Sequence, residues 1–522
     1  MVRGFKSLTR YFMEEVENGA TKEAVAIIGE SPSSAYSNLE TIKIKVIKMI
    51  YTQQQERIFD AIKNTGSHII INAGAGTGKT TTIVEAVNLI EEQAAFLAFN
   101  SKIAKALDEK LPDNVHAKTF HSFGFAAIRN AGIRTKVNNR KVHYICQELL
   151  GKDCYTNPIV KLVSRVKGAL VEGTDVKAIH GLINKFNISF QSDREEQQAV
   201  EAIPAILTLC RTQTHHIDFD DMIWLPLVNN YPKPHYGVVF VDEAQDFDKA
   251  QRTLILEVVQ DGRCIIVGDK NQAIYGFRGA DSNSIARFAE TLREGEREVV
   301  ELPLTVSWRC PKSVVKEANR FVADFSCPEN APQGSVIFDS PFLPQPQDMV
   351  LCRYNAPLVS AFYDLISRGK SAYINGKDMT KGLITSVKKI TRNNNMGVEE
   401  FASLFNADYE FNMGRLLKDG KTNQAMALED KKDCLMIFVQ KATTVGGIIE
   451  EIKRVFSGND EGEIMLSTVH KAKGLEANTV YILATERMPH KYGGVEENNI
   501  AYVAITRAKR NLYLVGPQIK KV

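Results

Sequence analysis

Residues 68–81 read HIIINAGAGTGKTT, and this stretch constrains the fold more than any other part of the chain. The run from His68 to Asn72 is rich in isoleucine, which predicts a short buried strand. Residues 80–90 repeat apolar side chains at helical spacing. Between the two lie Gly74, Gly76 and Gly78. A strand, a glycine loop and a helix predict a phosphate-binding loop, because successive backbone N–H groups and the helix N-terminus converge on the anion.

Two side chains at the end of this loop carry its chemistry. Lys79 is placed to reach the β- and γ-phosphates of a nucleotide, and the Thr80 hydroxyl can ligate Mg²⁺. An ordinary glycine-rich turn is the alternative, but Gly-Lys-Thr at the start of a helix favours a nucleotide site. Ala73 departs from the common pattern, which has a glycine there. The predicted nucleotide-binding residues of the loop are Ala73, Gly74, Ala75, Gly76, Thr77, Gly78, Lys79, Thr80 and Thr81.

A second apolar strand ends in two carboxylates, in the stretch GVVFVDEAQD at residues 237–246. Because the carboxyl ends of parallel strands meet at one edge of a sheet, these carboxylates are expected beside the phosphate loop. Asp242 would hold Mg²⁺, and Glu243 would act as the general base on the attacking water. An acidic turn without function is the alternative.

A third strand opens the stretch CIIVGDKNQAIYGFRGA at residues 264–280. Gln272 follows it, and an amide that both donates and accepts is suited to sensing a γ-phosphate. Tyr275 and Phe277 then lie beside Arg278, a combination that suits stacking on unpaired bases. An aromatic pair of this kind is more often part of a core, so both interpretations stay open.

Composition limits the remaining choices. The 522 residues predict three or four domains, and a net charge of +3 requires any nucleic-acid surface to be a local basic patch. The eight cysteines include no CxxC pair, which favours a reduced, intracellular chain without disulfides or zinc. No run of 18 apolar residues and no signal peptide is visible, so we expect a cytoplasmic protein.

Taken in order, the three stretches resemble superfamily 1 DNA helicases of the UvrD/Rep/PcrA type. The resemblance covers about residues 51–515. In the motif around Arg309, Ser307 and Trp308 replace the usual Asn and Tyr. Eight further stretches carry the resemblance: YTQQQERIF (51–59), FLAFNSKIAKAL (96–107), AKTFHSFGFAAIR (117–129), IDFDDMIWLPL (217–227), LTVSWRCP (304–311), VLCRYNAPL (350–358), STVHKAKGLEANTVYIL (467–483) and EENNIAYVAITRAKRNLYLV (496–515).

The resemblance implies an α/β fold in which two RecA-like P-loop domains with parallel sheets each carry a largely helical insertion. The expected units are a helical extension (1–50), a first RecA-like domain (51–122 and 216–290), its insertion (123–215), a second RecA-like domain (291–378 and 462–522) and a short insertion (379–461). The first insertion has a basic segment, which is a candidate strand- or duplex-binding face or a solvated helical surface. Its basic residues are Arg129, Arg134, Lys136, Arg140, Lys141, Lys152, Lys161, Arg165 and Lys167.

The resemblance also assigns roles to single residues. It implies that Gln55 reads the adenine, that Tyr275 lies near the base, and that Glu476 contacts the ribose. Arg309 and Arg507 would reach the γ-phosphate from the second domain. His121 and His470 have an alternative as satisfied cap or core histidines. The implied DNA contacts are Asn100, Thr119, Phe120, His121, Phe277, Arg278, Arg353, Thr468 and His470.

The function implied is that of an ATP- and Mg²⁺-dependent DNA helicase or single-stranded DNA translocase that moves 3′ to 5′. Its expected partners are single-stranded DNA and single-strand/duplex junctions, and a replication or repair protein stays open as a further partner. We expect a monomer that takes part in repair, replication or recombination. The alternatives are 5′ to 3′ movement, displacement of bound proteins with little unwinding, an RNA substrate, and a nucleotide-switched DNA-binding module.

Overall fold

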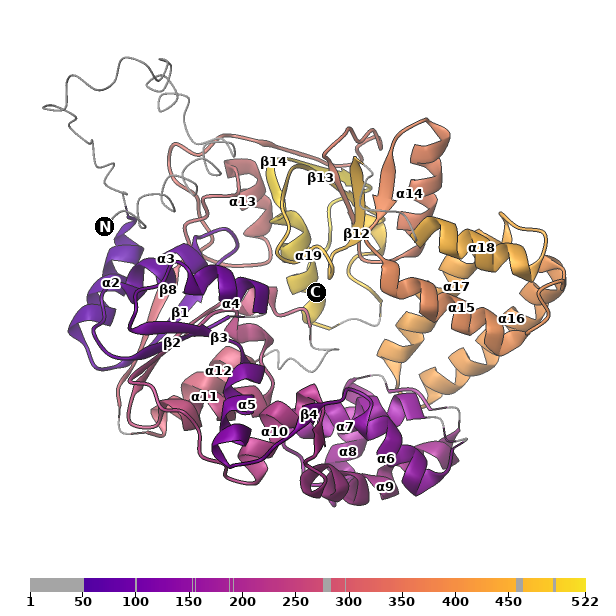
Figure 1. Ribbon diagram of the computed structural model, residues 1–522. Coiled ribbons are helices and arrows are strands. Elements are labelled where there is room, and N and C mark those ends of the chain that lie inside the picture. The colour runs from indigo at the N-terminus through magenta and orange to yellow at the C-terminus, as the bar shows by residue number, and fades with distance from the viewer. Residues whose placement is uncertain are drawn as a thin grey trace, which may run out of the picture.

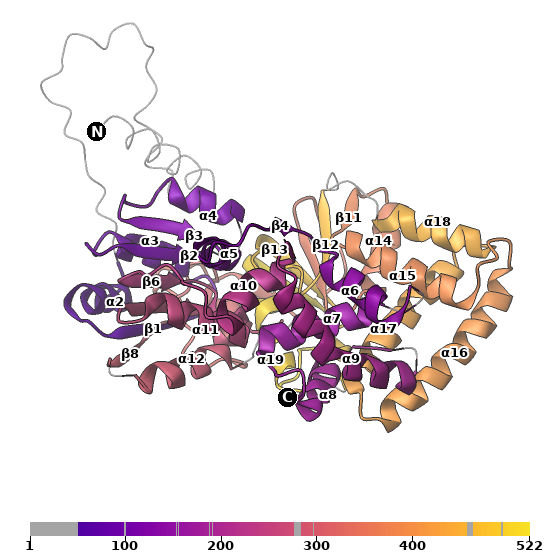
Figure 2. The same ribbon diagram turned by 60° about the horizontal axis from the view of Figure 1, so that its bottom comes forward.

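In a computed structural model of the chain, the described residues run from 51 to 522, with gaps at 99–100, 153, 155, 187, 191, 276–282, 296, 457–462 and 492–493. Two sheet domains lie side by side, and the groups of helices that they carry lie next to each other (Figures 1 and 2). The expected N-terminal extension, residues 1–50, lies outside the described residues.

The first domain is built on a six-stranded parallel sheet with the order β3-β2-β6-β7-β1-β8. Ile69 and Ile71 pack into one core on one face of this sheet, whereas Ile70 packs into another core on the opposite face. Both faces are therefore buried, which is why the strands read as continuous apolar runs. The strands are β1 (His68–Ala73), β2 (Ala94–Leu97), β3 (Val115–Lys118), β6 (Val238–Val241), β7 (Arg263–Gly268) and β8 (Val299–Leu304).

Helices cover both faces of this sheet, as expected for parallel strands joined by crossovers. They are α2 (Gln53–Asn64), α3 (Lys79–Val87), α4 (Ser101–Asp108), α5 (Phe120–Asn130), α10 (Phe219–Val228), α11 (Lys249–Val259) and α12 (Ser284–Arg293). Two short 3₁₀ turns, η2 (Ala244–Asp246) and η3 (Lys270–Gln272), follow β6 and β7. The sheet extends past the expected domain boundary at residue 290, because β8 pairs with β1 from His68 to Ala73.

The second domain has its own six-stranded parallel sheet, in the order β11-β12-β10-β13-β14-β9. Its strands are β9 (Ser335–Ile337), β10 (Met349–Cys352), β11 (Ala372–Ile374), β12 (Ile464–Thr468), β13 (Ala477–Leu483) and β14 (Ala508–Val515). Helices α13 (Lys312–Ala318), α14 (Ala356–Ser367) and α19 (Glu496–Ile505) and the turn η5 (Thr485–Arg487) complete it. Two parallel sheets with helical insertions confirm the expected fold class.

The first insertion forms a helical unit with a core of its own. That core includes Leu162, Ile203 and Trp224, so it reaches α10 of the first domain. Its elements are α6 (Lys141–Leu150), α7 (Thr156–Ala169), α8 (Val176–Lys185), α9 (Asp193–Thr212) and the two-stranded parallel pair β4 (Lys136–Val137) and β5 (His216–Ile217).

The second insertion consists of α15 (Lys377–Ile390), α16 (Val398–Lys418), α17 (Thr422–Val439) and α18 (Val445–Phe456). Phe401, Phe438 and Ile452 from these helices share one buried cluster with Val350 and Leu466 of the second sheet. The insertion and the sheet therefore bury a single continuous core. Within the described part of the chain, none of the helices is both long enough and apolar enough to cross a bilayer.

Candidate functional site

The glycine loop between β1 and α3 brings the two sheet domains together. Gly76 and Gly78 have φ angles of +68° and +79°, in the left-handed region that favours glycine. A Cβ on Gly76 would lie 2.4 Å from Cβ of Arg309, so the loop and the start of the second domain are in close contact. The Trp308 N–H also donates to the Gly76 carbonyl over 2.8 Å.

The predicted magnesium ligands lie next to each other. Oγ1 of Thr80, on the first turn of α3, donates to Oδ2 of Asp242 over 2.9 Å at the end of β6. Burial, with the neighbouring charge of Glu243, raises the pKa of Asp242 to about 6. Among the described residues, no group of three or more His, Cys, Asp or Glu side chains is arranged to hold a metal.

Glu243 is the predicted general base. Its backbone is left-handed, with φ of 55°, and Gln245 donates from Nε2 to its carboxylate. Nζ of Lys79 lies 4.0 Å from Oε1 of Glu243. Burial alone would raise the pKa of Glu243, but the charges of Lys79 and Lys473 outweigh it, so the pKa lies below its ordinary value. The side chain is therefore ionised, which general base catalysis requires.

Gln272 lies in η3, directly after β7, and its side chain is buried. Its Nε2 donates to Oδ2 of Asp269 over 2.8 Å. Asp269 is fully buried and also accepts from Oη of Tyr502, 3.4 Å away on α19. Gln272 is thus oriented by a carboxylate that itself contacts the second domain.

The second domain places two arginines at this site. Nε of Arg309 donates to Glu476, the residue implied to contact ribose, and Lys509 lies 3.2 Å from the same carboxylate. Arg507 is buried and donates from Nε to the Val503 carbonyl over 2.9 Å. Burial and the like charge of Arg309 lower the pKa of Arg507 to about 10. Both guanidinium groups are therefore held by contacts within the second domain, where Arg507 is buried and Arg309 is partly exposed.

Backbone and side-chain contacts also join the domains directly. The Ala75 N–H in the glycine loop donates to Oη of Tyr502 over 2.8 Å. Nζ of Lys473 lies 2.6 Å from Oδ2 of Asp246 and donates to the Gln272 carbonyl over 2.8 Å. Tyr275 donates from Oη to the His470 carbonyl over 3.0 Å.

Gln55 lies close to the glycine loop, with Nε2 4.0 Å from the position of a Cβ on Gly78. Its side chain completes a capping box with Thr52, and Nε2 donates to Oγ1 of Thr82 over 2.9 Å. These bonds fix the amide beside the loop that would hold the phosphates.

The implied DNA contacts have different surroundings. Thr119 caps α5, where its Oγ1 accepts from the Ser122 N–H over 3.2 Å. Phe120 is buried and packs edge-to-face on Phe247, with ring centroids 4.7 Å apart, so its ring is not open to a base. His121 packs on Phe219 at 5.2 Å, and burial lowers its pKa.

On the second domain, Arg353 forms an ion pair with Glu497, in which Nη2 lies 2.9 Å from Oε1. Thr468 ends β12, and His470 follows it in the next turn, so both lie at the carboxyl edge of the second sheet. Asn100, Phe277 and Arg278 lie outside the described residues.

Two residues of the expected basic face are not on the surface. Lys141 and Lys167 are buried, and each lies 2.7 Å from a carboxylate oxygen of Asp221. Lys167 also pairs with Asp218 at 3.2 Å. Counting these lysines toward a strand-binding face was wrong, because the fold uses them to neutralise buried carboxylates.

Two protein-family models match this chain and identify its family. Residues 52–293 match the UvrD/REP helicase N-terminal domain, and residues 368–517 match the UvrD-like helicase C-terminal domain. The chain belongs to the UvrD/REP helicase family. Both helical insertions lie within these two segments, whereas β8, β9, β10 and Arg309 lie in the stretch between them.

Curated relatives of this UvrD/REP member are distant. The F-box DNA helicase protein 1 of Schizosaccharomyces pombe is 24% identical over 89% of this chain and 57% of its own length. The ATP-dependent DNA helicase PcrA of Staphylococcus aureus is 26% identical over 54% of this chain and 41% of its own length. The chain thus spans about half the length of these relatives. A solved structure of Arterivirus nonstructural protein 10 (helicase) with DNA is 12% identical, covers 87% of this chain and 62% of that chain, and has a TM-score of 0.32.

Four site residues of this UvrD/REP member were missed by sequence reasoning: Asp246, Asp269, Lys473 and Tyr502. All lie in stretches that carry the family resemblance, so their location was visible. The sequence did not show which residues they contact, because each contacts a residue from another motif far along the chain.

Proposed function

We propose that the chain is an ATP-dependent DNA helicase and single-stranded DNA translocase that moves 3′ to 5′. It would act as a monomer on single-stranded DNA and on single-strand/duplex junctions, in repair, replication or recombination. The observation that carries the proposal is the meeting of both domains at one phosphate loop, where the Ala75 N–H contacts Oη of Tyr502. The family membership supports the activity, and the polarity rests on the resemblance alone.

The residues of this site suit hydrolysis of a nucleoside triphosphate. Thr80 and Asp242 would hold Mg²⁺, which when bound neutralises charge on the β- and γ-phosphates. Glu243 is ionised and would accept a proton from the attacking water, while Lys79 would contact the phosphates. Gln272 would orient the water or sense the γ-phosphate from the end of β7.

Movement would come from the second domain. Arg309 and Arg507 would contact the γ-phosphate, so its loss would weaken the contact between domains. Closure and opening of this cleft during each cycle would move the two DNA-contacting edges relative to each other. Glu476 already pairs with Arg309, so nucleotide binding would have to exchange this pair for contacts to ribose and phosphate.

The test is strand separation on duplexes with a 3′ or a 5′ single-stranded tail, measured together with DNA-stimulated ATP hydrolysis. The expected result is unwinding from the 3′ tail only, with none in the Lys79→Ala control. Unwinding from the 5′ tail would keep the motor and reverse its polarity. Stimulated hydrolysis without unwinding would favour a protein-displacing translocase, and absence of any DNA-stimulated hydrolysis would reject the proposal.

A further inference from the structure

The two helical insertions contact each other at the far side of the molecule. Nζ of Lys421, just before α17, lies 3.3 Å from Oε2 of Glu196 on α9. Gln424 donates from Nε2 to the Ile188 carbonyl over 3.4 Å. The groups of helices lie side by side in both views, with α9 near α17 in Figure 2. The insertions therefore form a second junction between the halves of the molecule, distinct from the nucleotide site.

A large cavity of about 1310 Å³ lies beside this junction. One wall comes from α7 and residues 189–190 of the first insertion, and the other comes from α15, α16, α17 and α18 of the second. Pockets that enclose one small ligand are typically about 300–1,000 Å³. This cavity exceeds that range, so it has room for a segment of an extended polymer.

The lining of this cavity is strongly basic. Lys161 contributes from the first insertion, and Asp408 is the one carboxylate among the described residues that line it. Nζ of Lys389 lies 3.2 Å from Oδ1 of Asp408, so that negative charge is already paired. The second insertion contributes Lys388, Lys389, Arg392, Arg415, Lys431 and Lys453.

Without a bound anion, the clustered positive charges of this cavity repel one another and raise the free energy of the folded protein. Lys431 has both Lys161 and Lys389 as charged neighbours, and its pKa is lowered by burial first and then by these like charges. Nε of Arg415 is buried and has no hydrogen-bond partner in the described part of the chain, although Nη1 of the same side chain lies 3.7 Å from Oδ1 of Asp193. Lys431 is thus a largely buried positive group with like-charged neighbours, and a bound anion would supply a matching negative charge.

Neutral polar side chains fill the spaces between these cations. They are Asn157, Ser189, Thr385, Ser386, Asn394 and Asn412. Hydroxyl and amide groups of this kind, together with lysine and arginine, are the side chains that contact phosphate and sugar along a nucleic-acid backbone. The aromatic rings of Phe190 and Phe405 also line the cavity but are buried, so they offer no open face for base stacking. The lining is thus suited to phosphates and not to bases.

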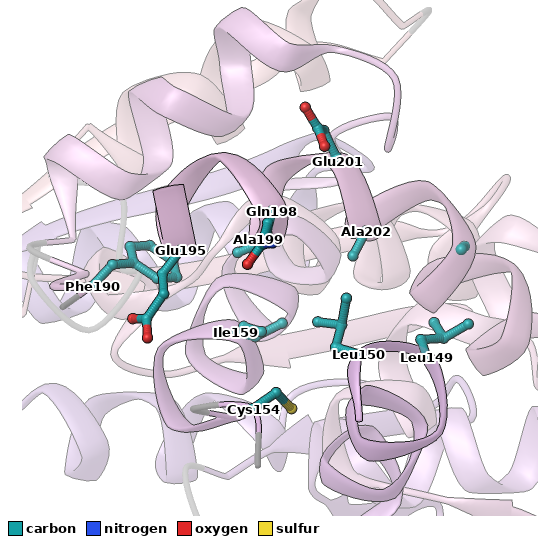
Figure 3. Close-up of a pocket in the computed structure, with 11 residues that line it drawn as sticks. Leu149, Leu150, Cys154, Ile159, Phe190, Glu195, Gln198, Ala199, Glu201 and Ala202 are labelled. Atoms are coloured by element: carbon teal, nitrogen blue, oxygen red, sulfur yellow. The ribbon is translucent and has the colours of Figure 1, made fainter. Parts of the chain in front are cut away.

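A neighbouring pocket has a different lining from this cavity. It lies within the first insertion, has a volume of about 600 Å³, and is lined by apolar side chains such as Leu150, Ile159 and Ala202 (Figure 3). Glu195 and Glu201 from α9 join its lining, and none of its described lining residues is basic. An anionic polymer would therefore favour the larger cavity.

We propose that the cavity between the two insertions binds the phosphate backbone of a single nucleic-acid strand, independently of sequence. The inference rests on the proposed function and adds a strand contact away from the nucleotide site. A single strand fits better than a duplex, because the space lies between two helical walls and the contacts on offer come from both.

The test compares two doubly charge-reversed proteins. Lys161→Glu with Lys388→Glu alters both walls of the cavity, and both lysines are exposed, so the fold should survive. The matched control is Lys63→Glu with Lys316→Glu, which changes the net charge equally at exposed sites on α2 and α13. Binding of a labelled oligothymidine is followed by anisotropy without nucleotide, over a range of salt concentrations, after the thermal midpoints are shown to match.

The salt dependence should report the lost contacts. Each phosphate contact to a single strand contributes about 0.7 to the slope of log affinity against log salt. The cavity variant should therefore lose roughly 1.4 from this slope, while the control keeps the wild-type value. Equal slopes in the two variants would overturn the cavity as a strand site and leave the helicase proposal standing. Failure of the wild-type protein to bind the oligonucleotide would instead reject the proposed function.

Binding assays with two further ligands, a blunt duplex and tripolyphosphate, distinguish other possible occupants of the cavity. If blunt duplex, but not the single strand, loses affinity in the cavity variant, the occupant is a duplex and the inference is wrong. If tripolyphosphate binds wild-type protein and not the cavity variant, while oligonucleotide binding is equal in both, the cavity is a polyphosphate site and the inference again fails.

Discussion

Lys473 of the second domain and Asp246 of the first form a buried ion pair, with Nζ 2.6 Å from Oδ2. The same ammonium group lies over the ring of Tyr275 at 4.9 Å. This pair links the acidic segment after β6 to the turn after β12, so it ties the two domains beside the nucleotide site.

Breaking this pair from one side should be more harmful than removing both charges. Lys473→Met leaves a buried carboxylate unpaired, and such changes cost about 3–5 kcal/mol. Lys473→Met combined with Asp246→Leu should recover most of that loss, because no buried charge then remains. Thermal unfolding of both variants measures the difference. A double variant as unstable as the single one would show that the pair does not dominate the junction.

Tyr502→Phe should strengthen nucleotide binding. Its hydroxyl accepts the Ala75 N–H, a donor that the phosphate loop would otherwise offer to a phosphate oxygen. A nucleotide must displace this bond, which is worth about 0.5–1.5 kcal/mol, so its removal should tighten ADP binding roughly two- to tenfold. Titration with a fluorescent ADP analogue tests this.

Tyr354→Phe is the matched control for that experiment. Tyr354 likewise bonds to the backbone through its hydroxyl, but as a donor, to the Arg487 carbonyl at 2.8 Å within the second domain. It should leave ADP affinity unchanged. Weaker ADP binding in Tyr502→Phe would show that the hydroxyl helps to hold the nucleotide.

Magnesium dependence should change with pH around the pKa of Asp242. Because this pKa is raised to about 6, the carboxyl group is ionised at pH 7.5 and mostly protonated at pH 5. A cation must compete with that proton, so its apparent affinity should fall by about tenfold per pH unit below 6. The Mg²⁺ concentration for half-maximal ATP hydrolysis, measured from pH 5 to 8, gives the profile. A flat profile would mean that Asp242 does not ligate the cation.

Arg507→Lys should abolish most ATP hydrolysis while preserving the fold. Lysine keeps the positive charge in the buried site but cannot present a guanidinium fork to phosphate. Loss of an arginine finger reduces turnover by about 10³-fold or more. Turnover is compared with ADP binding and the thermal midpoint, which should both stay near wild type. A loss of less than tenfold would show that Arg507 is structural.

Much of the candidate nucleotide site could be located from the sequence because its residues lie in short local patterns, and their roles stay predictions. Lys79, Thr80, Asp242 and Glu243 each directly follow a strand or a glycine loop, and strand ends of one parallel sheet meet at one edge. The two-sheet fold was implied by the resemblance to superfamily 1 helicases. The expected boundary of the first domain at residue 290 missed β8. Its alternating burial and Pro303 make this segment a weak strand signal in the sequence.

The sequence alone determined the elements, the phosphate loop and the family, since these depend on residues close together in the chain. Tertiary structure decided what each group faces. Lys141 and Lys167 read as surface charges but neutralise Asp221 in a core, and Phe120 packs on Phe247. The basic cavity likewise brings together Lys161 and Lys431, which are 270 residues apart in the chain. Burial and long-range pairing set the energy of a charge, and a linear sequence does not record them.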